Sequence, residues 1–235
     1  MVRITSDVET AKAYLAKGRP CVLALTKANK DKDLSFARFL VELDKEGLEL
    51  LEAGRYKELW QILGHDYMHL VEARVTGQPI VIGRQDRLTL RELVLEDYQA
   101  LYEYFEYEKP PFIEKFFDTK AEAKEYIKTY IEMVYDFYGY GLWAVVDNAN
   151  GELAGLVGFT PRQVTDDTDG TIGELMDLEL GYAIRGRYQR RGYGYEACKL
   201  AIDYAKEHID FNKIIVDIHE HNQPGQGLAR KLGII

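Results

Sequence analysis

The amino-acid sequence predicts an α+β protein built on a mixed α/β sheet. Two observations lead to this fold class. From residue 80 onward, segments that alternate apolar and polar residues like strands are mixed with segments whose apolar residues recur about every 3.6 residues, as in helices. Their order along the chain is strand, helix, helix, a meander of strands, and then strand, helix, strand, helix. This order does not fit a doubly wound sheet.

The first 78 residues predict a small N-terminal subdomain of helices and strands, for which the sequence indicates no function. Its expected elements are a helix over 7–17, a buried strand over 21–26, a stretch over 36–43 that fits either a strand or a helix, and mostly helix over 48–75. Gly77, Gln78 and Pro79 follow, and these residue types favour a break between domains. We therefore expect domains at 1–78 and 79–235.

Residues 79–235 contain the better defined elements. Thr119 and Glu122 have the spacing of a capping box, so a helix should begin there and run to about Tyr138. Asn148 to Gly151 is rich in turn residues and predicts a hairpin. The other expected elements are a strand at 87–93, a tyrosine-rich helix at 96–107, strands at 142–147, 153–160 and 178–184, a long helix at 192–208, a strand at 214–218 and a short helix at 226–232.

Composition limits the class of function. The chain has 235 residues, a net charge of −9, 46% hydrophobic residues and 29% charged residues, as expected for a globular protein with a core of useful size. An acidic chain is a poor general binder of nucleic acids or of anionic membranes, so we expect neither partner. No stretch approaches the ~18 apolar residues of a membrane span. Cys21 and Cys198 form no C-x-x-C pair and are expected to be reduced thiols in a cytoplasmic protein.

One turn stands out as a candidate anion site. The predicted strand 178–184 runs into a turn with Gly192 and Gly194, and the long helix begins there. The N–H groups at the start of a helix, together with its dipole, attract anions, and glycines let a ligand approach the backbone. Four positive charges that could bind a diphosphate lie in this turn, on Arg185, Arg187, Arg190 and Arg191. The alternative is a surface turn with solvated arginines.

Two motifs around this turn resemble a known family. The run from Gln189 to Gly194 resembles the Q/R-x-x-G-x-G/A signature of the GCN5-related N-acetyltransferases (GNAT family), and it lies between the right strand and the right helix. Residues 222–234 resemble the distal motif N-x-x-S-x-x-L-A-x-K-L-G-F of that family. The form without a tyrosine before the lysine is similar to the branch of ribosomal-protein N-terminal acetyltransferases. The resemblance covers about residues 80–235.

The resemblance implies a fold, a cofactor and a binding site. The fold would be a splayed central sheet flanked by helices, and the cofactor would be acetyl-CoA (CoA). The pantetheine arm would lie in the splay, the pyrophosphate on the turn, and Asn222 against the cofactor. The cofactor-binding residues would then be Tyr182, Ala183, Ile184, Gln189, Arg190, Arg191, Gly192, Tyr193, Gly194, Tyr195 and Asn222.

Direct acyl transfer also needs groups that move protons. Glu179 is the candidate general base, because strand alternation places it with Gly181 and Ala183, away from the apolar residues. A solvated or ion-paired role for Glu179, and a weaker rival at Glu174, remain open. A backbone N–H near Tyr182 and Ala183 could serve the oxyanion.

Three further groups of residues leave alternatives open. The positions at which the family often carries a serine or tyrosine proton donor are Gly225 and Ala229 here, so the general acid is unassigned. Tyr138, Tyr140 and Trp143 could line the acceptor site or belong to the core. His65 and His69 are four residues apart and residues 166–170 are acidic, but a third ligand is not evident, and we expect no metal site.

The function expected from these motifs is an acyl-CoA-dependent N-acyltransferase that moves an acetyl group from acetyl-CoA directly to a primary amine. The acceptor would be a small molecule or a peptide. The alternatives are a catalytically idle CoA-binding regulator or interaction protein, and a separate binding function in residues 1–78.

The family normally adds two strands after the distal motif, and without them the strand at 214–218 would have an open edge. A truncated chain, a partner subunit such as a second copy in a homodimer, or strands from residues 20–43 would each account for this edge.

Overall fold

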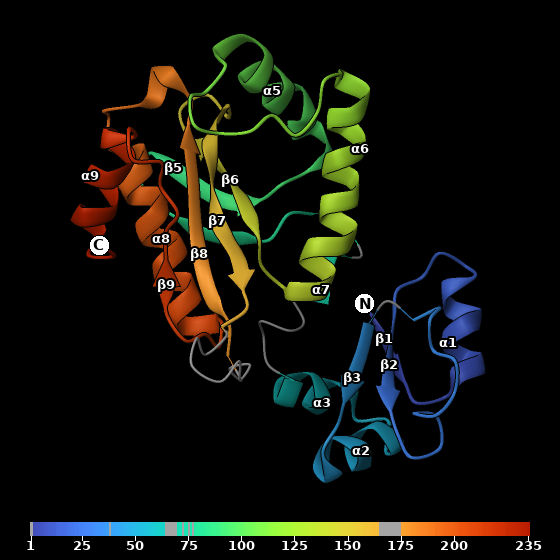
Figure 1. Ribbon diagram of the computed structural model, residues 1–235. Helices are drawn as coiled ribbons and strands as arrows, with labels where there is room; N and C mark the ends of the chain where they lie inside the picture. The colour runs from blue at the N-terminus through green and yellow to red at the C-terminus, as the bar shows by residue number, and fades with distance from the viewer. Residues whose placement is uncertain are drawn as a thin grey trace. The chain divides into compact units, whose positions relative to one another are not determined.

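The computed structural model describes residues 2–37, 39–63, 70–71, 73–74, 76, 78–164 and 175–235 (Figure 1). The chain divides into two compact units, Met1–Gln78 and Pro79–Ile235. His65, His69, Glu174 and the acidic segment 166–170 lie outside the described residues.

The first unit is built on a three-stranded parallel sheet in the order β1 (Arg3–Thr5), β2 (Cys21–Leu25) and β3 (Phe39–Glu42). Parallel neighbours need a crossover connection, and α1 (Val8–Leu15) provides it between β1 and β2. Two more helices follow β3, namely α2 (Lys45–Glu52) and α3 (Tyr56–Leu63). The ambiguous stretch 36–43 is therefore a strand, and the expected strand at 21–26 is confirmed as β2.

Both faces of this small sheet are covered by apolar side chains. Val22 and Ala24 pack into a cluster with Leu59 of α3, whereas Cys21 and Leu23 pack into a second cluster with α1. Central strands of parallel sheets read as continuous apolar runs because both faces are buried. This explains why residues 21–24 have no polar member.

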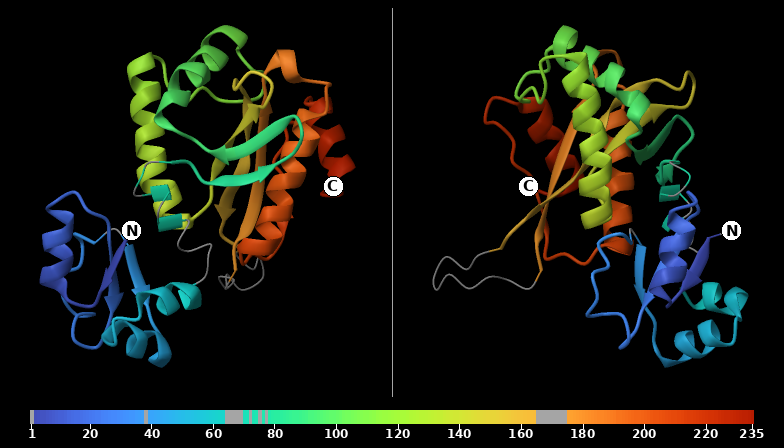
Figure 2. Two further views of the ribbon diagram at one scale, coloured as in Figure 1. Left: turned by 180° about the vertical axis from the view of Figure 1, so that it is seen from behind. Right: turned by 90° about the vertical axis from the view of Figure 1, so that its right-hand side faces the viewer.

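The second unit contains a six-stranded sheet (Figure 2). The spatial order is also the chain order: β4 (Val81–Arg84), β5 (Leu88–Glu92), β6 (Leu142–Asp147), β7 (Leu153–Arg162), β8 (Asp177–Ile184) and β9 (Ile214–Ile215). Neighbouring strands are antiparallel from β4 to β8, and only β8 and β9 run parallel. The predicted meander and mixed sheet are confirmed.

Helices lie on both sides of this sheet (Figure 1). One side carries η1 (Leu95–Asp97), α5 (Tyr98–Glu103), the π-helix η2 (Tyr104–Glu108), α6 (Lys120–Tyr130), the π-helix η3 (Ile131–Tyr135) and α7 (Asp136–Tyr138). The other carries α8 (Tyr193–His208), which follows the 3₁₀ turn η4 (Gly186–Tyr188), and α9 (Gln223–Leu232). The capping box that opens α6 is present, because Thr119 Oγ1 accepts the N–H of Glu122 at 3.1 Å and the Glu122 carboxylate accepts the N–H of Thr119.

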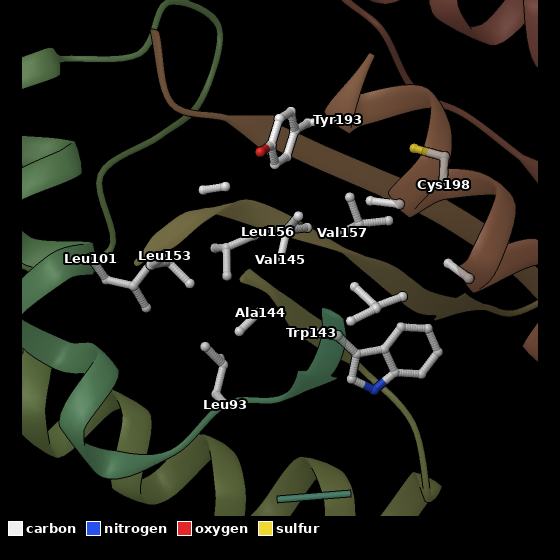
Figure 3. Close-up of a cluster of buried hydrophobic side chains, with 14 of the residues drawn as sticks. Leu93, Leu101, Trp143, Ala144, Val145, Leu153, Leu156, Val157, Tyr193 and Cys198 are labelled. Atoms are coloured by element: carbon white, nitrogen blue, oxygen red, sulfur yellow. The ribbon is translucent and has the colours of Figure 1, made fainter. Parts of the chain in front are cut away.

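The main core lies between the sheet and these helices (Figure 3). Trp143 is fully buried on β6, with its ring edge-on to Phe159 of β7 and to Tyr204 of α8. Trp143 is therefore a core residue and lines no acceptor site, whereas Tyr138 is exposed and Tyr140 is partly buried.

The structure differs from the sequence-based expectations at strands too short for a pattern. β1 has three residues and β4 has four, and neither was predicted. The strand expected at 214–218 pairs only through Ile214 and Ile215, and residues 216–218 leave the ladder. β2 and β3 belong to the separate three-stranded sheet, so they do not extend the six-stranded sheet at β9.

Close approach of two backbones at Gly158 gives a test of this sheet. A Cβ on Gly158 would lie 2.0 Å from the carbonyl oxygen of Gly141, whereas a Cβ on Gly227 in α9 would meet no atom within 4 Å. We expect Gly158→Ala to lower the free energy of unfolding by about 1–3 kcal/mol, because the strands must move apart. Gly227→Ala, the matched control, should raise it by up to about 1 kcal/mol through helix propensity. Denaturant unfolding of both variants measures this, and equal effects would contradict the proposed packing.

Candidate active site

The two strands β8 and β9 separate soon after they pair. Their ladder contains only the pairs Leu178–Ile214 and Glu179–Ile215, and the chain beyond Ile215 turns away from β8. On its other side β8 stays paired with β7 as far as Ile184, opposite Gly155. The last five residues of β8 therefore have one edge held by β7 and one edge without a ladder partner among the described strands.

The pairing with β7 determines which backbone groups face this gap. The N–H of Arg185 donates to the carbonyl of Ala154 at 2.9 Å, so by antiparallel alternation Ala183 exchanges its hydrogen bonds with Leu156. The backbone groups of Tyr182 and Ile184 then point away from β7 and into the gap. Of the three predicted backbone contacts, Ala183 can offer a ligand only its methyl group.

The gap is part of a cleft of ≈ 330 Å³. Its walls come from β8, the segment that follows β9, and residues 111–116 after η2, and residues of η2, β6 and β7 also line it. Phe112 and His219, from two of these walls, stack with ring centroids 4.9 Å apart. Phe112 has a φ of 67°, which is rare for a bulky residue and holds its ring in this position.

Tyr182 links the floor of the cleft to α9. Its phenol donates a hydrogen bond to the carbonyl oxygen of Gly225, in the first turn of α9, at 2.8 Å. Burial raises the pKa of Tyr182 to about 12, so the phenol keeps its proton in the neutral range. Asn222 is the N-cap of the same helix, with its Oδ1 accepting the Gly225 N–H at 3.0 Å, and it also lines the cleft.

Glu179 lines the cleft but is not a free carboxylate. Its Oε2 accepts a hydrogen bond from Nε of Arg162, on the neighbouring strand β7, at 2.5 Å. The side chain of Glu179 is only 21% exposed, and this bond raises the pKa of the Arg162 guanidinium. No described residue donates a hydrogen bond to the second oxygen, Oε1, which leaves it available to a water molecule or a substrate.

The turn between β8 and α8 forms the other end of the site. Gly192 is the N-cap of α8 with a φ of 88°, and Arg190 also has a positive φ of 56°. Gly192 has no side chain to accept a hydrogen bond from the helix, and the first N–H groups of a helix have no partner within it. A Cβ on Gly194 would lie 3.3 Å from Leu228 and 3.4 Å from Ile184, so this glycine lets β8, α8 and α9 meet. The backbone and dipole here fit an anionic group such as a phosphate.

Carboxylates neutralise part of the positive charge that the sequence places in this turn. Nε of Arg185 bonds Glu108 Oε1 at 2.5 Å, and Arg187 lies 3.0 Å from Glu152. Within the described residues, Arg190 and Arg191 have no acidic partner, and the guanidinium of Arg191 lies 5.8 Å from the ring centre of Tyr193. These two arginines are the ones left to attract an anion.

The remaining predicted residues of the turn mainly hold it in place. The Gln189 side chain donates to the carbonyl of Ile184 at 2.7 Å. The buried Tyr193 phenol donates to Asp147 at 3.0 Å, and the Tyr195 ring lies 4.2 Å from Nζ of Lys231. Gln189 and Tyr193 therefore fix the turn with their side chains and can contact a ligand through their backbone.

Sequence reasoning missed Arg162, which holds Glu179, and four further residues at this site: Arg87, Glu108, Phe112 and His219. Arg87 lies over the N-cap of α8, Glu108 accepts the N–H of Gly186 at 2.9 Å, and the other two close the cleft. Each lies far in sequence from the residue that it contacts, and none belongs to a local motif. Glycines and arginines between a strand and a helix predict an anion turn but not which distant side chains reach it.

Other kinds of site receive no support from the described residues. Within them there is no group of three or more His, Cys, Asp or Glu side chains that could hold a metal ion. In the same residues, every helix is too short or too polar to cross a membrane. Cys21 and Cys198 are buried free thiols, and burial raises the pKa of both.

Comparison with known proteins identifies the family. The acetyltransferase (GNAT) domain family matches residues 87–235, which is more than half of the chain. The chain belongs to this family, and the resemblance predicted from residues 189–194 and 222–234 is confirmed.

Individual relatives are more distant. YkkB of Bacillus subtilis (strain 168) is 30% identical over 97 residues, which are 41% of this chain and 52% of YkkB, so the match spans about half of that protein. The uncharacterized N-acetyltransferase YnaD of the same organism is 24% identical over 156 residues, 63% of this chain and 79% of YnaD. Among solved structures, the ribosomal-protein-S5-alanine acetyltransferase of Vibrio fischeri has the same fold, with a TM-score of 0.52 and 17% identity over 64% of this chain and 81% of its own.

The anion turn can be tested at its N-cap. Gly192→Glu would place a side chain where Arg87 lies, force a φ of 88° on a non-glycine residue and add a negative charge to the anion site. We expect it to abolish binding of CoA in calorimetric titration. Gly227→Glu adds the same charge in open space on α9 and should leave the affinity for CoA within about twofold, well under the ~1.4 kcal/mol of a tenfold change. Normal binding by the Gly192 variant would show that the turn holds no anion.

Proposed function

We propose that this protein is an acetyl-CoA-dependent N-acetyltransferase that transfers an acetyl group directly to a primary amine. The observation that carries the proposal is the separation of β8 from the chain after Ile215, next to the start of α8. The edge of β8 that lacks a strand partner is followed by the turn that could bind an anion. This order suits a ligand with a polar amide arm at one end and phosphates at the other.

In our proposal, different residues of this site bind different parts of the cofactor. The N–H groups from Gly192 to Tyr195, with Arg190 and Arg191, would bind phosphate oxygens. The outward carbonyl of Tyr182 and the N–H of Ile184 would bond the pantetheine amides, with Ala183 packing beside them. Because Oδ1 of Asn222 caps α9, Nδ2 is the atom that this residue can offer to the cofactor.

The catalytic groups that we propose are few. The Oε1 atom of Glu179 would accept a proton from the amine, through a water molecule, while Arg162 holds the other oxygen of that carboxylate. The N–H of Tyr182 points into the gap and would donate to the oxyanion. We assign no general acid, so the leaving thiolate would take its proton from solvent.

The acceptor would enter the cleft at the end of β8 that carries Glu179. Residues of the segment 111–116 and of the segment after β9 line the cleft there. We propose a small-molecule or peptide amine, and the ribosomal-protein acetyltransferases with this fold make a peptide N-terminus the first acceptor to test. We also propose that residues 1–78 form a small α/β subdomain, which the division of the chain into two compact units supports. We propose that the protein acts in the cytoplasm, which suits its two buried free thiols.

A second candidate function is a CoA-binding protein without turnover. The absence of a hydroxyl at Gly225 and Ala229 and the ion pair of Glu179 favour it. Calorimetric titration with acetyl-CoA and with CoA tests the cofactor site that both functions share. Release of CoA in the presence of amine acceptors separates them, because only the enzyme turns over.

The role of Glu179 predicts a separation of binding from rate. Glu179→Gln keeps the shape and the hydrogen bond to Arg162 but removes the base, so turnover should fall ~10²-fold or more. The affinity for acetyl-CoA, measured by titration, should stay near that of the unsubstituted protein.

Asp203→Asn is the matched control, because Asp203 is an ion-paired carboxylate on α8 that lies outside the cleft. This variant should keep full turnover. Turnover of the Glu179 variant equal to that of the control would show that Glu179 is not the base.

A further inference from the structure

Arg87, which precedes β5, lies against the start of α8 although the two are more than a hundred residues apart in sequence. Its Nη2 is 2.4 Å from the position that a Cβ on Gly192 would occupy, so the guanidinium rests on the N-cap itself. Its carbon Cζ lies 5.1 Å from the ring centre of Tyr193. No side chain other than hydrogen fits at position 192 while Arg87 stays there.

The positive charge of Arg87 lies at the N-terminal end of α8, where the helix dipole is also positive. The N-terminus of a helix carries a partial positive charge, which repels a cation nearby. Glu196, in the first turn of α8, offsets this repulsion through two hydrogen bonds, from Nε at 2.7 Å and from Nη2 at 2.5 Å. The pair is partly exposed, with 42% of the Arg87 side chain and 26% of the Glu196 side chain accessible, and such pairs contribute little to stability.

The geometry leaves Arg87 with donors to spare. A guanidinium has five N–H donors, and the bidentate contact with Glu196 uses one on Nε and one on Nη2. The remaining donors lie beside the glycine N-cap, where the first N–H groups of α8 are also unpaired within the helix. An anion bound here would be attracted both by Arg87 and by the positive end of the helix dipole, and it would offset the repulsion between them.

We propose that Arg87 is a phosphate-binding residue of the acetyl-CoA site, which adds a third guanidinium to those of Arg190 and Arg191. This assignment rests on the proposed function. It places a contact to the cofactor at the start of β5, outside the turn and outside both sequence motifs. Glu196 is then the counterion of Arg87 in the protein without cofactor, and not itself a contact to the cofactor.

The competing explanation is that Arg87 only ties β5 to α8 through Glu196. The two explanations differ in what happens when Glu196 loses its charge. If the pair is only a tie, Arg87→Gln and Glu196→Gln break the same contact and should have the same effect. If Arg87 binds phosphate, Glu196→Gln removes a negative charge beside the anion and leaves the cation in place, so CoA should bind at least as tightly.

The experiment is calorimetric titration of the full chain and its variants with CoA and with 3′-dephospho-CoA. A lost charged hydrogen bond corresponds to about a 10–100-fold weaker affinity, and we expect this loss for Arg87→Gln but not for Glu196→Gln. Arg55→Gln is the matched control, because Arg55 forms a similar exposed pair with Glu58 in the first unit. A thermal unfolding curve for each variant confirms that it is folded.

Each outcome decides between the explanations. A loss with both ligands supports a contact to the diphosphate, and a loss confined to CoA supports a contact to the 3′-phosphate. Affinity of Arg87→Gln within about twofold of the unsubstituted protein overturns the proposal, because a lost charged contact exceeds that change. Equal losses in Arg87→Gln and Glu196→Gln overturn it as well. If the unsubstituted protein binds neither ligand, the proposed function itself fails, which is a different result from a failure confined to Arg87.

Discussion

The site depends on the early end of the β8–β9 ladder at Glu179 and Ile215. Backbone N–H and C=O groups need hydrogen-bond partners, so a strand inside a sheet that lacks them on one edge leaves a place for a polar ligand. The unbroken pairing of β8 with β7 keeps this edge straight and fixes which residues face the gap. Helix α9 reinforces the separation, because Tyr182 donates to Gly225 across it.

This acidic protein has a locally positive region at the start of α8, because carboxylates neutralise some of its arginines and not others. The chain carries a net charge of −9, yet several arginines gather around the start of α8. Carboxylates hold Arg185, Arg187 and Arg87 in fixed directions, whereas Arg190 and Arg191 have no acidic partner among the described residues. Fixed pairs lower the cost of ordering long side chains when a ligand binds. The result is a small region of oriented donors in a molecule that otherwise repels anions.

Aromatic residues shape the other end of the cleft, which the carboxylates of Glu114, Glu179 and Asp217 also line. The ring of Phe112 stacks on His219 although its backbone adopts a φ that bulky residues avoid. Tyr130 and Tyr135 anchor the neighbouring helical segments, since their hydroxyls bond backbone groups of Leu142 and Leu93. Strained residues persist only where their surroundings hold them, so the position of Phe112 suggests a wall that is set before an acceptor enters.

The sequence by itself determined the elements whose signals are local: the capping box of α6, the hairpin at 148–151, the alternation along β8, and the glycine turn before α8 with its family motif. Only the tertiary structure decided how far β9 pairs, that Ala183 bonds β7, that Trp143 is core, and that Arg87 reaches Gly192. The reason is physical. Local spacing fixes the period and the caps of one element, whereas pairing, charge neutralisation and contact between distant segments depend on which surfaces the fold brings together.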